Sequence, residues 1–274
     1  MTNRSRLSAG VIVLCALVLC PCSAGASVDP YGTAEALYTA GQYDAAVQAA
    51  RQIGSAEAHA LGARALLAKT ESQVPFDQRL PVLKEAEAEA DAAIAANDKV
   101  IEGHLQKLMA YCYITRMPGF RDGDIAASRV SRTMLDRALA LEPNNPWALA
   151  ALGGWNLEII RRAPLGLGGI LFGANRTKGM AAFEKALVLA PNNVVIRYEF
   201  GLALLSLDDR KAAESALTAA IVLQTDDAYS RFLQARGQRL LALVAAQDHR
   251  TLDKVLAAYR GERKDVSTNP APKL

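Results

Sequence analysis

The sequence predicts an all-α protein, and its composition and its residue pattern both support this class. About one residue in five is Ala, the best helix former, and only 6% of the residues are aromatic. Apolar residues recur at helical spacing along most of the chain, and one segment with this spacing is repeated later in the sequence. With 274 residues, of which 51% are hydrophobic and 22% charged, the chain can bury a core. A disordered chain, a collagen and a protein with many membrane spans are therefore excluded.

Helices are expected in close succession after the first thirty residues. Pro143 and Pro191 are expected to end helices, because Pro cannot continue one. Asn145 is expected to cap the helix that begins at Pro146, and Asp226 to cap a later one. The expected helices span residues 31–40, 43–53, 55–71, 81–97, 100–115, 124–142, 146–162, 175–190, 194–207, 209–223, 227–246 and 249–259.

The first 26 residues have the pattern of a secretory signal peptide. Arg4 and Arg6 precede an apolar run over residues 11–19, and Ala24-Gly25-Ala26 supplies the small residues of a cleavage site before Ser27. The run is shorter than the roughly 20 residues that a membrane span needs. We therefore expect a periplasmic or secreted protein whose mature chain has no integral membrane span.

Two alternatives remain open for this segment, a lipid anchor on Cys20 or Cys22 and an uncleaved anchor. Lipoprotein signals have a small residue before the Cys, whereas Leu19 and Pro21 stand there. Removal of the segment leaves Cys112 as the single Cys, so no internal disulfide is expected. The remaining chain has 29 basic and 28 acidic residues, a formal charge of +1, which argues against a nucleic-acid partner.

A repeated segment organises the rest of the chain. The nine residues 137–145 (RALALEPNN) match residues 185–193 (KALVLAPNN), and an apolar-Gly step follows ten residues after each Pro, at Gly153 and Gly201. A third copy ends near Ala220, which is 34 residues after Ala186. A Gly at these steps is expected where two helices cross closely, since a side chain there would force their axes apart.

These residues resemble the tetratricopeptide repeat, a pair of antiparallel helices with a 34-residue period. Residues 41–46 (GQYDAA) are similar to the turn and second helix of an earlier copy. The resemblance implies a right-handed superhelix of antiparallel helix pairs, an α-solenoid of about five repeats with C-terminal capping helices. This domain is expected over residues 27–261, followed by a disordered polar tail at 262–274.

One repeat carries an insertion. Gly153 and Gly201 are 48 residues apart rather than 34, and the 14 added residues fall between the two helices of one repeat. They include an apolar, Gly-rich stretch over residues 163–173, flanked by basic residues. We expect a loop that covers helix ends with its own apolar residues, a lid or partner-contact loop, or a loop that does both. The residues predicted for that contact are Leu165, Leu167, Ile170, Leu171 and Phe172.

The resemblance implies a binding scaffold, because in that family the first helices of the repeats line a concave groove that takes a peptide or a helix. The residues that match groove positions include His104, Lys107, Tyr111, Trp147, Leu157, Glu158, Tyr198, Leu202 and Ser206. For each of them the alternative is ordinary packing between repeats. Because this face is mainly apolar and aromatic, an apolar segment is the expected ligand rather than a carboxylate.

Two functions follow, and neither is enzymatic. The first is an exported, non-catalytic scaffold that binds an apolar peptide or helix of a protein in the cell envelope. The alternative is a small-molecule or lipid-binding accessory protein, since Gly168-Gly169 and the insertion are similar to the helical-repeat component associated with tripartite ATP-independent periplasmic transporters. The three His residues form no metal or nucleophile motif, so we expect no catalytic residue, no metal and no cofactor.

Overall fold

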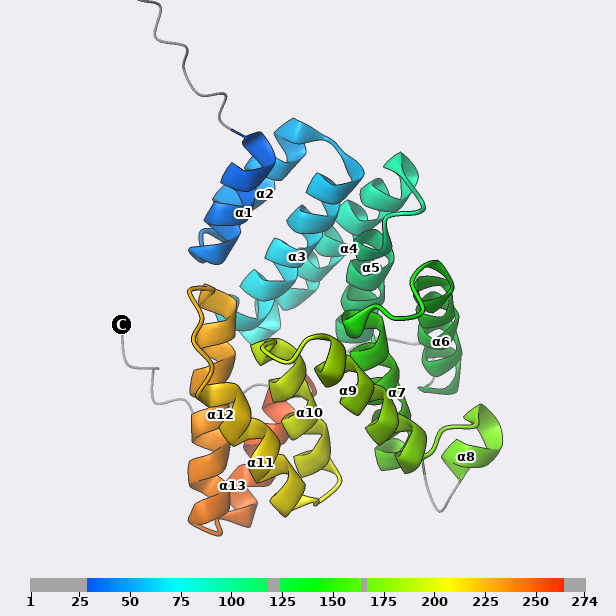
Figure 1. Ribbon diagram of the computed structural model, residues 1–274, viewed down its shortest axis with the longest axis vertical. Helices are drawn as coiled ribbons and strands as arrows, with labels where there is room; N and C mark the ends of the chain where they lie inside the picture. The colour runs from blue at the N-terminus through cyan, green and yellow to red at the C-terminus, as the bar shows by residue number, and fades with distance from the viewer. Residues whose placement is uncertain (1–28, 118–123, 164–166, 264–274) are drawn as a thin grey trace, which may run out of the picture.

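The computed structural model describes residues 29–117, 124–163 and 167–263, and all regular elements within them are helices (Figure 1). The prediction of an all-α protein is confirmed, and each predicted helix begins and ends within two residues of an observed one. The elements are α1 (Pro30–Thr39), α2 (Tyr43–Ile53), α3 (Ala56–Ser72), the 3₁₀ turn η1 (Phe76–Gln78), α4 (Arg79–Ala96), α5 (Ile101–Ile114), α6 (Asp124–Leu141), α7 (Pro146–Arg162), α8 (Leu167–Phe172), α9 (Arg176–Leu189), α10 (Val194–Ser206), α11 (Arg210–Ile221), α12 (Ala228–Ala245) and α13 (His249–Tyr259).

The structure confirms one of the two predicted helix caps and corrects the other. The side chain of Asn145 accepts hydrogen bonds from the backbone N–H groups of residues 147 and 148, so the predicted cap of α7 is confirmed. The predicted cap at Asp226 is wrong by one residue, because Asp227 accepts the bond from the Ser230 N–H at 2.7 Å. The segment that forms the short helix α8 is expected from the sequence to be a loop. Its six residues, Leu-Gly-Gly-Ile-Leu-Phe, are too few to show apolar residues recurring at helical spacing.

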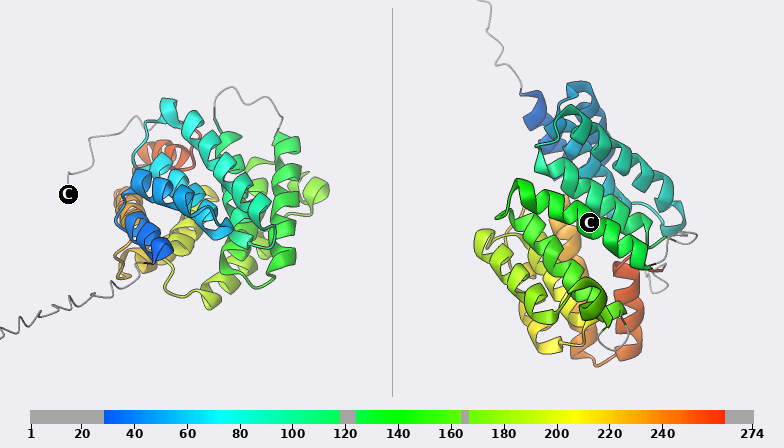
Figure 2. Two further views of the ribbon diagram at one scale, coloured as in Figure 1. Left: turned by 90° about the horizontal axis from the view of Figure 1, so that it is seen from above. Right: turned by 90° about the vertical axis from the view of Figure 1, so that its right-hand side faces the viewer.

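Consecutive helices pack against each other along the chain, which is compatible with a helical repeat. Helices α1–α5 form one end of the molecule, and α7 and α9–α13 form the other (Figures 1 and 2). Helix α12 returns to the beginning of the chain and contacts both α1 and α3. The last long helix thus joins the two ends of the array.

Close helix crossings hold the second half together. A Cβ atom on Gly201 would lie 2.6 Å from Cγ of Leu217, and one on Gly153 would overlap the ring of Phe183. Phe183 is buried and stacks on Phe200 with 4.8 Å between ring centroids. The prediction that Gly153 and Gly201 allow close crossings is confirmed.

Several sequence predictions fall outside the described residues. They are the signal segment at residues 1–26, Leu165 of the insertion and residues 264–274 of the predicted tail. The first two residues of that tail are described, and Glu262 is held by hydrogen bonds rather than disordered. Within the part of the chain that the structure describes, Cys112 is the single free cysteine, and burial raises the pKa of its thiol. No helix in that part is both long enough and apolar enough to cross a membrane.

Candidate functional site

The predicted groove residues divide into a buried group and an exposed group. Leu157, Tyr198 and Leu202 are 1%, 1% and 6% exposed and belong to the core of the second half, so a partner cannot reach their side chains in this structure. The hydroxyl of Tyr198 is buried and has no hydrogen-bond partner among the described residues. For these three residues the structure shows packing between helices.

The other predicted groove residues lie on several helices rather than around one space. The ring of His104 is 2.8 Å from the carbonyl oxygen of Asp98, and Lys107 forms an ion pair with Asp91 at 2.5 Å. Trp147 stands in the first turn of α7 with 42% of its surface exposed, and Tyr111 is partly buried in α5. The structure therefore does not bring these residues together into one site.

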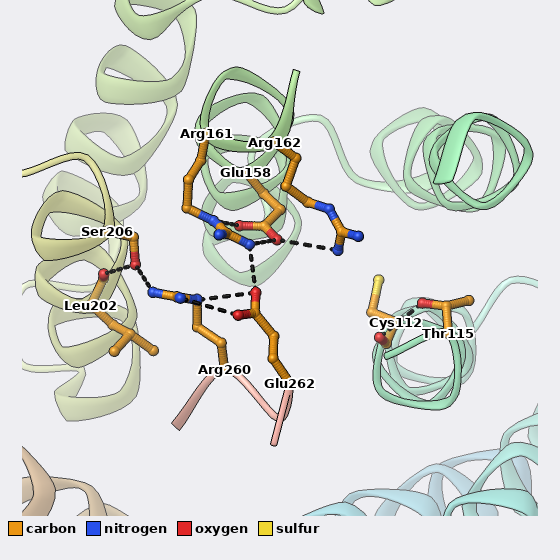
Figure 3. A network of polar contacts seen from close by, with 9 residues as sticks. All are labelled: Cys112, Thr115, Glu158, Arg161, Arg162, Leu202, Ser206, Arg260 and Glu262. Carbon is orange, nitrogen blue, oxygen red and sulfur yellow. Dashed lines mark hydrogen bonds and ion pairs between the residues drawn. The ribbon is translucent and has the colours of Figure 1, made fainter. Parts of the chain in front are cut away.

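Glu158 is the predicted groove residue around which a polar site is built (Figure 3). Its carboxylate accepts two hydrogen bonds from the Arg161 guanidinium, at 2.7 and 2.8 Å, and lies 3.8 Å from Arg162. Arg161 also donates to the carboxylate of Glu262 at 2.5 Å. The end of α7 thereby holds the segment that follows α13.

The same segment is held from α10. Arg260 donates two hydrogen bonds to Glu262, at 3.2 and 3.1 Å, and one to the hydroxyl of Ser206 at 2.8 Å. Ser206 in turn donates to the carbonyl oxygen of Leu202. We call the set Glu158, Arg161, Arg162, Ser206, Arg260 and Glu262 the arginine–glutamate cluster.

A glycine turn places Glu262 in this cluster. Helix α13 ends at Tyr259, and Gly261 adopts φ of +73°, a left-handed conformation that residues with a Cβ rarely adopt. The N–H of Gly261 bonds to the carbonyl of residue 258, and that of Glu262 to the carbonyl of residue 257. This helix termination reverses the chain, so that Glu262 points back at α7.

Arginine charges dominate the electrostatics of the cluster. Burial by itself would raise the pKa of Glu158, but the hydrogen bonds from Arg161 and the charges of Arg116 and Arg162 lower it to about 2. Burial likewise opposes the ionisation of Glu262, and its hydrogen bonds and charge interaction with Arg260 lower its pKa overall. Both carboxylates are therefore ionised at neutral pH, and the surrounding guanidinium groups favour a bound carboxylate at this place.

A second polar group lies inside the molecule, between α3 and α12. Arg236 donates to Glu71 at 2.6 Å, and the two side chains are only 10% and 5% exposed. Tyr113 and Tyr229 donate their hydroxyl hydrogens to the other carboxylate oxygen of Glu71. The Arg236 guanidinium also lies 4.3 Å from the ring centroids of Phe232 and Tyr259. These contacts tie the end of the chain to its beginning.

Glu199 on α10 lies near this interior group, and we expect it to make the free energy of unfolding depend on pH. Burial, and next the negative charge of Glu71, raise the pKa of Glu199 from 4.5 to about 7 against the opposing charges of Arg116 and Arg236. The folded state therefore favours the protonated carboxyl, while the unfolded chain ionises it near pH 4.5. The free energy of unfolding should fall as pH rises from about 4.5 to about 7.

Replacing Glu199 with Gln should remove this loss. We expect Glu199→Gln to raise the free energy of unfolding by about 1–3 kcal/mol at pH 8 and to have little effect at pH 4.5, because each pKa unit corresponds to about 1.4 kcal/mol. Urea unfolding at the two pH values measures this. Glu214→Gln on the exposed face of α11 is the control, and an equal gain in that variant would contradict the assignment.

The predicted contact loop lies elsewhere on the surface. Leu167, Ile170 and Leu171 on α8 are 44%, 80% and 48% exposed, whereas Phe172 packs edge-on against Trp155 with 6.1 Å between centroids. Helix α8 lies on the side of α7 away from α12 and α13 (Figures 1 and 2). The loop residues and the arginine–glutamate cluster therefore form two separate surfaces.

Most of the helical array matches one known protein family. The model of one protein family, described as regulator of microtubule dynamics protein 1-3, matches residues 32–245. The chain belongs to the regulator of microtubule dynamics protein 1-3 family. The family match covers α12, with Arg236, and ends before α13 and the segment that carries Arg260 and Glu262. No curated protein compared with the chain matches it.

Sequence reasoning missed most of the residues that build these two polar groups. Arg161 is one of the basic residues that flank the insertion, and no sequence pattern singles out Glu71, Arg236, Arg260 or Glu262. Arg161 and Glu262 are 101 positions apart in the sequence, and Glu71 and Arg236 are 165 positions apart, so no local pattern relates the members of either pair. The usable signal was Gly261, which follows a helical pattern at the place of a terminating glycine.

Proposed function

We propose that this protein is an exported, non-catalytic scaffold that binds a peptide segment at the arginine–glutamate cluster. One observation carries the proposal: Glu262 of the chain itself is held there by Arg161 and Arg260, beside the predicted groove residues Glu158 and Ser206. A site in which two guanidinium groups hold the carboxylate of Glu262 can hold the carboxylate of a peptide ligand in the same way.

The consecutive helix pairs and the two glycine crossings support a tetratricopeptide-like superhelix as the framework. In such a framework the Glu262 segment lies where an external peptide is expected. The proposed ligand is an apolar segment of an envelope protein that carries one acidic side chain, which differs from the purely apolar segment expected from the sequence. The family description names no reaction, and so it is compatible with a binding function.

The bound Glu262 segment competes with any external peptide. A tethered segment acts at a high effective concentration and occupies the site for most of the time. A free peptide can bind only to the fraction of molecules whose site is open, so its apparent affinity is reduced in proportion to that fraction. Weakening the internal contact should therefore strengthen binding from outside.

A fluorescent peptide copying residues 257–266 tests this proposal. We expect Glu262→Gln to bind the peptide about tenfold more tightly than the unmodified protein, since an amide in place of a carboxylate loses a charge-assisted bond of about 1.5 kcal/mol. Arg161→Gln should abolish the gain when combined with Glu262→Gln. Fluorescence anisotropy measures both.

A surface arginine provides the matched control. Arg250→Gln, at an exposed position of α13 outside the cluster, should leave peptide affinity and the set of proteins captured from an envelope extract unchanged. If Arg161→Gln captures the same proteins as the unmodified chain and leaves the peptide affinity unaltered, the cluster is not the binding site.

The small-molecule alternative has a different candidate place. An open pocket of about 570 Å³ lies beside α8, between α6, α7 and α9, and Arg132, Lys178 and Lys185 contribute to its lining. An enclosed apolar cavity capped by the insertion would have favoured a carried lipid or metabolite, and this pocket is open. Native mass spectrometry of the purified protein would reveal such a ligand as added mass.

A further inference from the structure

We propose that α8 and the basic residues around it form a docking surface for an anionic lipid bilayer, with Ile170 and Leu171 entering the interfacial layer. This surface is separate from the arginine–glutamate cluster and does not depend on the peptide-binding proposal.

Exposed apolar side chains are concentrated on α8. Ile170 is 80% exposed, and Leu167 and Leu171 are 44% and 48% exposed, which places three such side chains within five residues. No other stretch of five residues in the described part of the chain holds three large exposed apolar side chains. An apolar group of this kind marks an interaction surface.

Helix α8 packs on α7 with one face, so the apolar side chains on its other face stay exposed. Phe172 packs on Trp155, and the backbone of Gly168 lies so close to Ile159 that an added Cβ would be 2.9 Å from its Cγ2 atom. Gly173 then reverses the chain with φ of +65° before α9 begins. These contacts fix one face of α8 on α7 and leave Ile170 and Leu171 on the other.

Basic residues are more numerous than acidic ones around α8. Residues 159–182 contain four basic residues and no acidic one, although the chain after residue 26 carries a formal charge of only +1. Among these four, Arg161 and Arg162 lie against Glu158 in the arginine–glutamate cluster, and Arg176 pairs with Asp209. The charge available to a lipid phosphate comes from Lys178 and Lys185, two exposed residues of α9 that line the open pocket next to Phe172. This charge is complementary to an anionic membrane surface.

The shape of the surface favours a bilayer over a protein partner. Helix α8 lies at the edge of the molecule (Figure 1), and its side chains Ile170 and Leu171 are exposed. A protein partner would have to provide a pocket that matches them. A bilayer accommodates protruding apolar side chains without such a pocket and offers phosphates to the flanking cations. Apolar insertion and charge attraction then act on the same helix.

Vesicle flotation with the purified protein tests this inference. We expect binding to vesicles of equal parts phosphatidylglycerol and phosphatidylcholine, and weak binding to phosphatidylcholine alone. The double variant Ile170→Asp/Leu171→Asp should reduce partitioning into anionic vesicles at least about tenfold. Lys178→Gln/Lys185→Gln should reduce it by about the same factor, since each surface cation contributes about fivefold.

Val188→Asp is the matched control, because Val188 is 79% exposed but lies at the opposite end of α9 from α8. It should leave vesicle binding unchanged, and comparison among variants holds any contribution of the N-terminal segment constant. Failure to bind anionic vesicles would overturn the inference, as would an equal loss in Val188→Asp. It would also be overturned if Ile170→Asp/Leu171→Asp changed the oligomeric mass measured by light scattering while vesicle binding persisted.

Discussion

Replacing Arg236 with Met is expected to lower the free energy of unfolding by about 3–5 kcal/mol, the largest effect that we expect from one substitution. Arg236 is the charge partner of Glu71, and the two side chains are only 10% and 5% exposed. Without the guanidinium, the carboxylate of Glu71 stays buried with two tyrosine hydroxyls as its remaining partners. The loss is mainly the penalty of an uncompensated buried charge rather than the net value of the pair.

Urea unfolding measures this effect, and two further variants separate its causes. Glu71→Leu combined with Arg236→Met should recover most of the stability, because the apolar pair leaves no buried charge. Arg137→Met breaks an ion pair with Asp98 whose side chains are 49% and 62% exposed, and it should cost under about 1 kcal/mol. A loss in Arg236→Met no larger than that of Arg137→Met would show that α12 does not depend on this contact.

The second large effect concerns two adjacent glycines on α7 that should respond to Ala in opposite directions. Gly153→Ala should lower the free energy of unfolding by about 1–3 kcal/mol, because the new methyl group would overlap the Phe183 ring, which is buried and stacked on Phe200. Gly154→Ala should raise it by about 0.5–1 kcal/mol, since the nearest atom would be 3.9 Å away and Ala is the better helix former.

The pair forms its own control, because the two substitutions add the same group to the same helix one residue apart. Thermal and urea unfolding should therefore rank the proteins as Gly154→Ala, unmodified and Gly153→Ala, from most to least stable. Equal responses at both positions would mean that α7 and α9 do not cross at the face of Gly153.

Local residue patterns were sufficient to predict the long helices of this protein, but not the six-residue helix α8. Ala-rich segments with apolar residues at helical spacing form helices because both the propensity and the buried face are properties of neighbouring residues. Pro143 and Asn145 mark the end of one helix and the start of the next through their own backbone and side-chain chemistry. The crossing at Gly153 could also be predicted, because a glycine inside a helix is unfavourable unless close packing compensates.

The candidate sites were predicted only in part. Glu158 was chosen for its repeat position and does lie in a polar cluster, whereas Tyr198 and Leu202, chosen in the same way, are buried in the core. The repeat position states which face of a helix a residue occupies. It does not state whether another part of the chain already covers that face.

The sequence by itself thus determined the fold class, the boundaries of the long helices, the glycine crossings and the apolar character of the segment that became α8. Only the tertiary structure decided that α12 returns to α3 through Glu71 and Arg236, and that Glu262 lies between Arg161 and Arg260. The physical reason is the range of the interactions. Helix formation depends on residues within a few positions, whereas these ion pairs join residues 101 and 165 positions apart and exist only once the whole chain has packed.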